Sequence, residues 1–277
     1  MHPVPILMYH SVSDHADTRY RTWAVTTNRF AAHMAMLADN GYAAFGVSTA
    51  VGRLLAGLPL PEKFVVLTFD DGLQDFLSGA VPVLDKHGFE ATLYVVAGAV
   101  DGTSEWLAPL GEGARPMLRA EELAALHANG IEIGAHSFTH PELDLLDRIS
   151  CANEIRASRL ALENMIGAQV RSFAYPFGYA SRTTRSLVQE AGFQSAVRVR
   201  HALSDVSENR FGLSRLIIRH DVDEAGLMAL VQGRGVPVAP SLDRFSGTCW
   251  RIARRMRKRL GNAPGPVAGH STAGGML

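Results

Sequence analysis

The stretch FVVLTFDDG, Phe64–Gly72, ends a run of apolar residues on two adjacent carboxylates. The apolar part has the length and composition of a buried strand, so Asp70 and Asp71 would lie at its carboxyl end. Two neighbouring negative charges at the edge of a core repel each other and lose solvation. A bound cation or a catalytic role would account for that cost. In the alternative interpretation, Asp70 caps the next helix and Asp71 is solvated.

The geometry of a strand limits what the two carboxylates can do together. Adjacent side chains of a regular strand point to opposite faces. Asp70 and Asp71 can therefore reach one site only if the chain is already leaving the strand, and Gly72 permits such a turn. One carboxylate could then bind a cation while the other stays free.

The composition of the chain is that of an ordinary globular protein. Of 277 residues, 47% are apolar and 19% are charged, which differs from a disordered chain. The formal net charge is zero, so no overall field favours nucleic acid. Cys151 and Cys249 lack metal-type spacing, and a disulfide framework is not expected. The N-terminus MHPVPILMYHSV has no basic or long apolar segment of a signal peptide, so we expect a cytoplasmic protein.

Strand and helix patterns alternate along most of the chain. This alternation predicts an α/β fold with a parallel sheet, open or closed into a barrel, in one domain over residues 1–235. The predicted strands are Pro5–Tyr9, Phe64–Phe69, Ala91–Val96, Ile131–His136, Val170–Gly178 and Gln194–Val199. The predicted helices are Asn28–Asn40, Gln74–His87, Ala120–Ala128, Cys151–Ile166 and Thr183–Ala191.

Residues 236–277 differ in composition from the predicted domain. Six basic residues lie between Arg251 and Arg259. If this segment is helical, Trp250, Ile252, Met256 and Leu260 form a partial apolar stripe suited to an anionic membrane surface. A solvated, charged tail explains the pattern equally well. The Gly-, Ala- and Pro-rich residues that follow are expected to be disordered.

Candidate polar residues follow several predicted strands at their carboxyl ends, the edge at which α/β barrels place their active sites. They include His10, the two aspartates and His136. His136 and His140, in HSFTH, have a spacing that lets two imidazoles chelate one ion on a helical turn. The spacing alone is a weak signal, but it directly follows an apolar strand. Two histidines and one aspartate form a plausible catalytic zinc set.

Five segments in this order resemble the polysaccharide deacetylases, the NodB-homology enzymes of carbohydrate esterase family 4. They are ILMYHSVS, TFDDGLQD, ATLYVVAG, IEIGAHSFTHPEL and FAYPFG. The resemblance covers about residues 4–200. It implies a distorted (β/α) barrel of about seven strands. It also implies hydrolysis of N-acetyl groups on amino sugars, using zinc or a similar divalent metal.

The resemblance also implies roles for individual residues. Asp71, His136 and His140 match the metal ligands. Asp70 matches the general base that takes a proton from the attacking water. Phe177 matches the residue whose backbone N–H holds the oxyanion.

Two further assignments concern the substrate side of the site. Tyr175, in the same turn as Phe177, would line the substrate site or pack in the core. The segment MYH resembles the poly-N-acetylglucosamine deacetylase branch, in which His10 would be the general acid. An imidazole that titrates near neutrality suits that role.

The chain departs from the family pattern at the position where an Arg usually pairs with the base, which here is Ala174. Arg171 and Arg215 are the candidate partners of Asp70. His220 ends the apolar run RLIIRH and is either a site residue or the end of a closing strand. Trp106 could stack on a sugar ring or anchor its loop.

The sequence supports one leading function and two alternatives. The leading prediction is a metal-dependent deacetylase acting on an amino sugar of a polysaccharide or a lipid-linked glycan precursor. A His₂Asp site accepts Zn²⁺, and also cobalt, nickel or manganese. The alternatives are a hydrolase of a non-sugar cyclic amide on the same barrel and a non-catalytic glycan-binding module.

Overall fold

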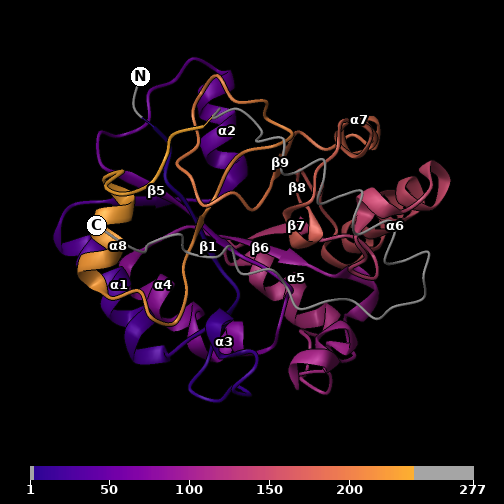
Figure 1. Cartoon of the computed structure of the whole chain (residues 1–277), viewed down its shortest axis with the longest axis horizontal. Coiled ribbons are helices and arrows are strands. Elements are labelled where there is room, and N and C mark those ends of the chain that lie inside the picture. The colour runs from indigo at the N-terminus through magenta and orange to yellow at the C-terminus, as the bar shows by residue number, and fades with distance from the viewer. Residues whose placement is uncertain (1–2, 240–277) are drawn as a thin grey trace, which may run out of the picture. The chain divides into compact units, whose positions relative to one another are not determined.

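A computed structural model describes residues 3–239 of the chain (Figure 1). These residues belong to one compact unit. The basic segment Arg251–Arg259, for which membrane contact is predicted, lies outside the described residues, as does nearly all of the predicted tail.

The central element is a curled parallel sheet in which seven strands follow the order β10-β1-β5-β6-β7-β8-β9, and an eighth, β4, pairs with β5. Every pairing between neighbouring strands of this sheet is parallel. The strands are β1 (Ile6–Tyr9), β4 (Ala43–Phe45), β5 (Phe64–Phe69), β6 (Thr92–Val95), β7 (Glu132–Ala135), β8 (Ser172–Ala174), β9 (Ser195–Val197) and β10 (Leu216–Ile217). Two further short strands, β2 (Ser11–Val12) and β3 (Ala24–Val25), pair with each other.

The sheet closes on itself through the segment that leads into β10. Leu213 forms a parallel bridge with Val197 of β9, with hydrogen bonds of 2.9 Å from the Arg198 N–H to Leu213 O and from the Leu213 N–H to Ala196 O. Because β10 then pairs with β1, the strands enclose a barrel with one irregular seam. The predicted distorted (β/α) barrel is confirmed.

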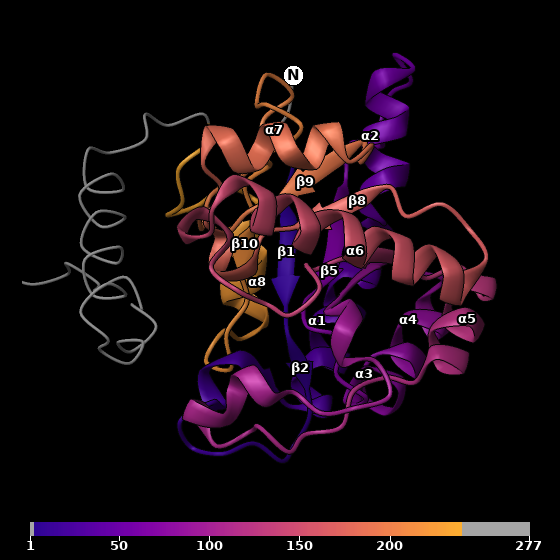
Figure 2. The same cartoon turned by 90° about the vertical axis from the view of Figure 1, so that its right-hand side faces the viewer.

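Helices surround the strands (Figures 1 and 2). They are α1 (Thr27–Asp39), α2 (Val47–Leu55), α3 (Asp75–Gly79), α4 (Val81–His87), α5 (Ala120–Ala128), α6 (Arg148–Ile166), α7 (Arg182–Glu190) and α8 (Glu224–Val231). Since helices cover the outside, strands such as β1 and β5 are buried along their whole length, as expected of a parallel sheet. Among the described residues, no helix is long and apolar enough to cross a membrane.

Two differences from the sequence-based prediction have clear causes. The prediction of a single helix over Gln74–His87 is wrong, because this segment forms two helices, α3 and α4, that meet at Ala80. Pro82 lies in the first turn of α4, where the backbone N–H that proline lacks would have no partner within the helix. The elements β4, α2 and α8 were not predicted. β4 is only three residues long, so its pairing with β5 rather than its own pattern defines it.

Candidate metal and catalytic site

The chain leaves β5 between the two aspartates. The Asp70 N–H still bonds to Tyr9 O of the neighbouring strand at 3.0 Å. Asp71 adopts φ 77° and Gly72 φ 83°, so the left-handed turn begins at Asp71 itself. Both carboxylates are buried, with 2% and 3% of each residue exposed. The turn therefore brings two acidic groups to one buried place.

Asp71, His136 and His140 converge at the carboxyl ends of β5 and β7, and their ligand atoms lie within 4.8 Å of one another. Asp71 Oδ1 is 3.8 Å from His136 Nε2 and 3.6 Å from His140 Nε2. Two ligands about 2.1 Å from a tetrahedral ion lie about 3.4 Å apart. The three side chains thus fit one divalent cation with little movement.

The groups around the two histidines keep their Nε2 atoms available. His136 Nδ1 lies 2.8 Å from Ala174 O, and because a carbonyl only accepts, Nδ1 carries the proton and Nε2 has the lone pair. Burial lowers the pKa of both imidazoles. Neutral imidazoles with a fixed orientation are what a metal requires.

The segment His136–His140 is a loop and not the helical turn that the spacing suggested. Ser137 and His140 both have φ 62°. Ser137 Oγ accepts the His140 N–H at 3.0 Å, and Glu154 of α6 accepts the N–H groups of Phe138 and Thr139 at 2.9 and 2.8 Å. The loop is therefore held by side chains instead of helical hydrogen bonds.

Asp70 forms a bidentate ion pair with Arg215, the residue before β10. The Oδ1–Nη1 and Oδ2–Nη2 distances are 2.6 and 2.7 Å, and Arg215 is fully buried in the barrel. Arg171, the other sequence candidate, is exposed and bonds to Gln169. Ala174, at the usual Arg position, instead supplies the carbonyl that orients His136.

The two aspartates have opposite pKa shifts. Burial by itself raises the pKa of Asp70, but the charge and hydrogen bonds of Arg215 and the field of His136 hold it well below the ordinary value. Burial, together with the neighbouring charge of Asp70, raises the pKa of Asp71 to about 8. Asp70 is thus ionised at neutral pH, whereas Asp71 holds a proton that a cation would displace.

His10 follows β1 and lies within the electrostatic field of Asp70, Arg215 and His136. Its ring packs on Trp23, with centroids 4.8 Å apart. Burial lowers the pKa of His10 to about 4, so the expected titration near neutrality does not hold for the protein without substrate.

The turn after β8 separates its two aromatic residues. Phe177 is 40% exposed, with φ 59° and its ring 4.8 Å from that of His140. Its N–H is in the first turn of Pro176–Gly178, where amides lack an internal partner. Tyr175 is fully buried and its hydroxyl donates to Phe211 O at 2.9 Å. Packing, and not substrate contact, is the role its position allows.

Two tryptophans flank the site. Trp106 stacks on His140, with ring centroids 5.2 Å apart. From the sequence, Trp106 was expected either to stack on a sugar ring or to anchor its loop. Trp23, on His10, was not predicted, because its sequence neighbours carry no recognisable pattern. His220 follows β10 and is not part of the Asp71–His136–His140 group.

Comparisons with known proteins agree with this geometry. The sequence pattern of the polysaccharide deacetylase family matches residues 57–196. YxkH of Bacillus subtilis, named for the same family, is 28% identical over 229 residues, which are 83% of this chain and 76% of YxkH. The poly-β-1,6-N-acetyl-D-glucosamine N-deacetylase of Escherichia coli K12 is 33% identical over 106 residues, 38% of this chain but only 16% of that protein.

Solved structures share the fold. Streptococcus pyogenes deacetylase PplD, in complex with acetate, superposes with a TM-score of 0.72 at 22% identity, over 83% of this chain and 98% of PplD. IcaB from Ammonifex degensii gives a TM-score of 0.68 at 22% identity, over 83% and 97% of the two chains.

Proposed function

The chain belongs to the polysaccharide deacetylase family, and on that premise we propose that it is a metal-dependent hydrolase that removes N-acetyl groups from an amino sugar of a glycan. The observation that carries the proposal is the buried Asp71–His136–His140 group beside a carboxylate that Arg215 keeps ionised. We propose Zn²⁺ as the ion, with cobalt, nickel or manganese as substitutes. A lipid-linked substrate stays a prediction.

Asp70 is the proposed general base. When bound, a divalent cation lowers the pKa of water and polarises the acyl carbonyl. Asp70 takes the proton of the attacking water, because it is ionised and its oxygens keep lone pairs beyond those that Arg215 occupies. The bidentate pair with Arg215 holds the carboxylate in one orientation, which preserves the alignment that proton transfer needs.

Phe177 and His10 complete the proposed mechanism. The Phe177 N–H donates to the oxyanion that forms on the acyl oxygen. His10 gives a proton to the departing amine. Since its pKa is about 4 before substrate binds, His10 takes up that proton from solvent during the reaction, when negative charge on the tetrahedral intermediate raises the pKa. Asp70 releases the proton of the attacking water to solvent afterwards, so the protons balance over one turnover.

The test compares purified wild type with Asp70→Asn and His136→Ala, measuring bound metal and acetate release from N-acetylglucosamine oligomers. Wild type should bind about one metal per chain and release acetate. Asp70→Asn should keep the metal and lose activity by about 10²–10⁴-fold, the usual share of a general base. His136→Ala should lose both.

Other outcomes discriminate among the candidate functions. Metal binding without acetate release by wild type would contradict an amino-sugar substrate and favour a non-sugar amide, which can be assayed with cyclic amides. Sugar affinity without metal or turnover would instead identify a glycan-binding module.

A further inference from the structure

Two loops pack against each other beside the site and form what we term the loop pair: residues 13–26, which precede α1, and residues 99–118, which precede α5. Their contact is a small apolar cluster separate from the main core. Its buried members are Tyr20, Ala24, Leu73, Leu107 and Met117, with both Trp23 and Trp106 packed against them. The two loops thus share a small core, to which Leu73 of the aspartate turn also contributes.

Each loop of the pair places a tryptophan on a histidine of the site. Trp23 packs on His10, the proposed acid, and Trp106 on His140, a proposed metal ligand. Both tryptophans are half-buried. The Trp106 Nε1–H is buried and donates to no described group. Partly exposed aromatic side chains beside a few polar groups are typical of a small-molecule site, so the two tryptophans are suited to contact a sugar ring.

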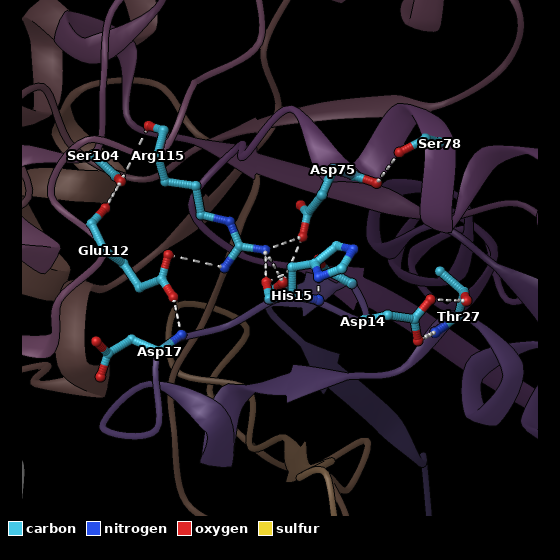
Figure 3. Close-up of polar contacts among 11 residues, drawn as sticks. Asp14, His15, Asp17, Thr27, Asp75, Ser78, Ser104, Glu112 and Arg115 are labelled. Atoms are coloured by element: carbon cyan, nitrogen blue, oxygen red, sulfur yellow. Dashed lines mark hydrogen bonds and ion pairs between the residues drawn. The ribbon is translucent and has the colours of Figure 1, made fainter.

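A polar cluster centred on Arg115, which we term the clasp, joins the two loops to the barrel (Figure 3). Arg115 Nη2 donates to Ser11 Oγ at 2.7 Å and to Asp75 Oδ2 at 2.8 Å. Its other terminal nitrogen lies 3.6 Å from Glu112. Glu112 in turn accepts the N–H of Asp17, in the other loop, at 2.5 Å.

The clasp is largely removed from water. The exposed fractions of the Arg115, Asp75 and Glu112 side chains are 10%, 14% and 12%. The Arg115 guanidinium also lies 5.5 Å from the centre of the Tyr20 ring, in the apolar cluster. An ion pair in such surroundings is screened less by solvent than one on the surface, so it contributes more to holding the loops in place.

Backbone hydrogen bonds hold the loop of residues 99–118 to the aspartate turn without Arg115. The Gln74 N–H bonds to Pro116 O and the Leu118 N–H to Gly72 O, both at 3.0 Å. Disrupting the clasp should therefore change the spacing of the two loops, which still share their apolar cluster, while the metal ligands stay in place.

We propose that Arg115 is a positioning residue: through the clasp it sets the spacing of Trp23 and Trp106, and that spacing determines how tightly the amino-sugar ring binds. This inference rests on the proposed function for its substrate. It assigns to the loop pair the binding of the sugar, whereas the ends of the strands perform the hydrolysis.

The test uses Arg115→Lys, since a lysine cannot serve Ser11, Asp75 and Glu112 from one planar group. Arg159→Lys is the matched control. Arg159 likewise pairs with a carboxylate, Glu163 at 2.8 Å, bonds to the Ala191 carbonyl at 2.5 Å and lies 5.6 Å from the Phe193 ring, but it is on α6 and outside the loop pair.

The expected result for Arg115→Lys is a KM for N-acetylglucosamine oligomers raised about tenfold, with kcat changed less than about threefold and bound metal unchanged, as for a loss of uniform binding. Acrylamide quenching of tryptophan fluorescence, measured without substrate, should increase. Arg159→Lys should leave KM and quenching as in wild type. Glu112→Gln, a milder change to the same cluster, should shift KM and quenching in the direction of Arg115→Lys.

Equal KM and quenching in the two lysine variants would overturn the clasp proposal, as would a fall in kcat at constant KM. If wild type itself releases no acetate, the proposed function fails. The quenching comparison, which needs no substrate, then decides alone: a difference confined to Arg115→Lys supports the positioning of the tryptophans, and no difference refutes it.

Discussion

At the scale of single residues, the pairing of Asp70 with Arg215 determines the chemistry of the site. A carboxylate this deeply buried would hold a proton at neutral pH and could not act as a base. The fully buried guanidinium reverses that shift. Removing one member of such a pair is costly because the other charge is left without a partner.

The first prediction concerns Arg215→Met. Without the guanidinium, burial raises the pKa of Asp70, so the base is protonated over a wider range of acidic pH. The acidic limb of the kcat/KM profile should move up by at least about one pH unit, and the free energy of unfolding should fall by about 3–5 kcal/mol. Arg171→Met, at the exposed candidate, is the control and should change neither. An unmoved acidic limb would contradict the base assignment of Asp70.

The second prediction concerns Asp71→Asn in the metal-free protein. The pKa of Asp71 is raised to about 8 on folding, so the unfolded chain loses its proton first. The stability of wild type should therefore fall as pH rises from about 4 to 8, by up to about 1.4 kcal/mol per pH unit. Asp71→Asn removes this dependence and, if it matches protonated wild type in stability near pH 4, should be about 5 kcal/mol more stable than wild type at pH 8.

Chemical denaturation of both proteins in chelator, at pH 5 and pH 8, checks the effect. A stability difference between the two proteins that is the same at both pH values would show that Asp71 ionises normally in the folded protein.

At the scale of elements, the turn after β8 is the part of the site most sensitive to backbone shape. Gly178 has φ +75°, and a Cβ there would lie 2.5 Å from the Val199 backbone nitrogen. The turn can therefore keep its shape only with glycine, and that shape directs the Phe177 N–H.

Gly178→Ala should lower kcat by about 10²-fold, the usual effect of losing an oxyanion donor, and leave bound metal unchanged. Gly41→Ala is a matched control, because Gly41 has the same φ of +75° but nothing within 4 Å of the added Cβ. It should cost about 1 kcal/mol of stability and no activity. Steady-state kinetics of both variants, with their metal content, measure the outcome, and equal kcat values would remove the turn from the mechanism.

The sequence predicted most of the elements and the convergence of DDG with HSFTH, because local patterns encode buried strands and the parallel sheet gathers their ends at one edge. It could not choose Arg215 over Arg171. That choice depends on β10, a strand of two residues defined by its pairing with β1. Trp23 was missed for a related reason, since its contact with His10 depends on how a loop folds back.

At the scale of the whole molecule, the proposed cation links turns that follow two different strands. Excess Zn²⁺ should raise the free energy of unfolding by about 4 kcal/mol when it is present at a thousand times its Kd. For a chain of this size that is about 10 °C in Tm. Differential scanning calorimetry with Zn²⁺ and with chelator tests this. His136→Ala should show almost no shift in Tm. A wild-type Tm that is the same with Zn²⁺ and with chelator would argue against a metal centre.

The position of β1 has a consequence for how the protein is made. Leu7 pairs with Leu67 on one side and with Leu216 on the other. During synthesis one edge of β1 therefore stays unpaired until β10 has been synthesised and nearly all of the barrel is outside the ribosome. Contacts so distant in the chain slow folding, and an open strand edge invites pairing with other chains. Folding yield should thus depend on translation speed and on chaperones that shield the nascent amino-terminal strand.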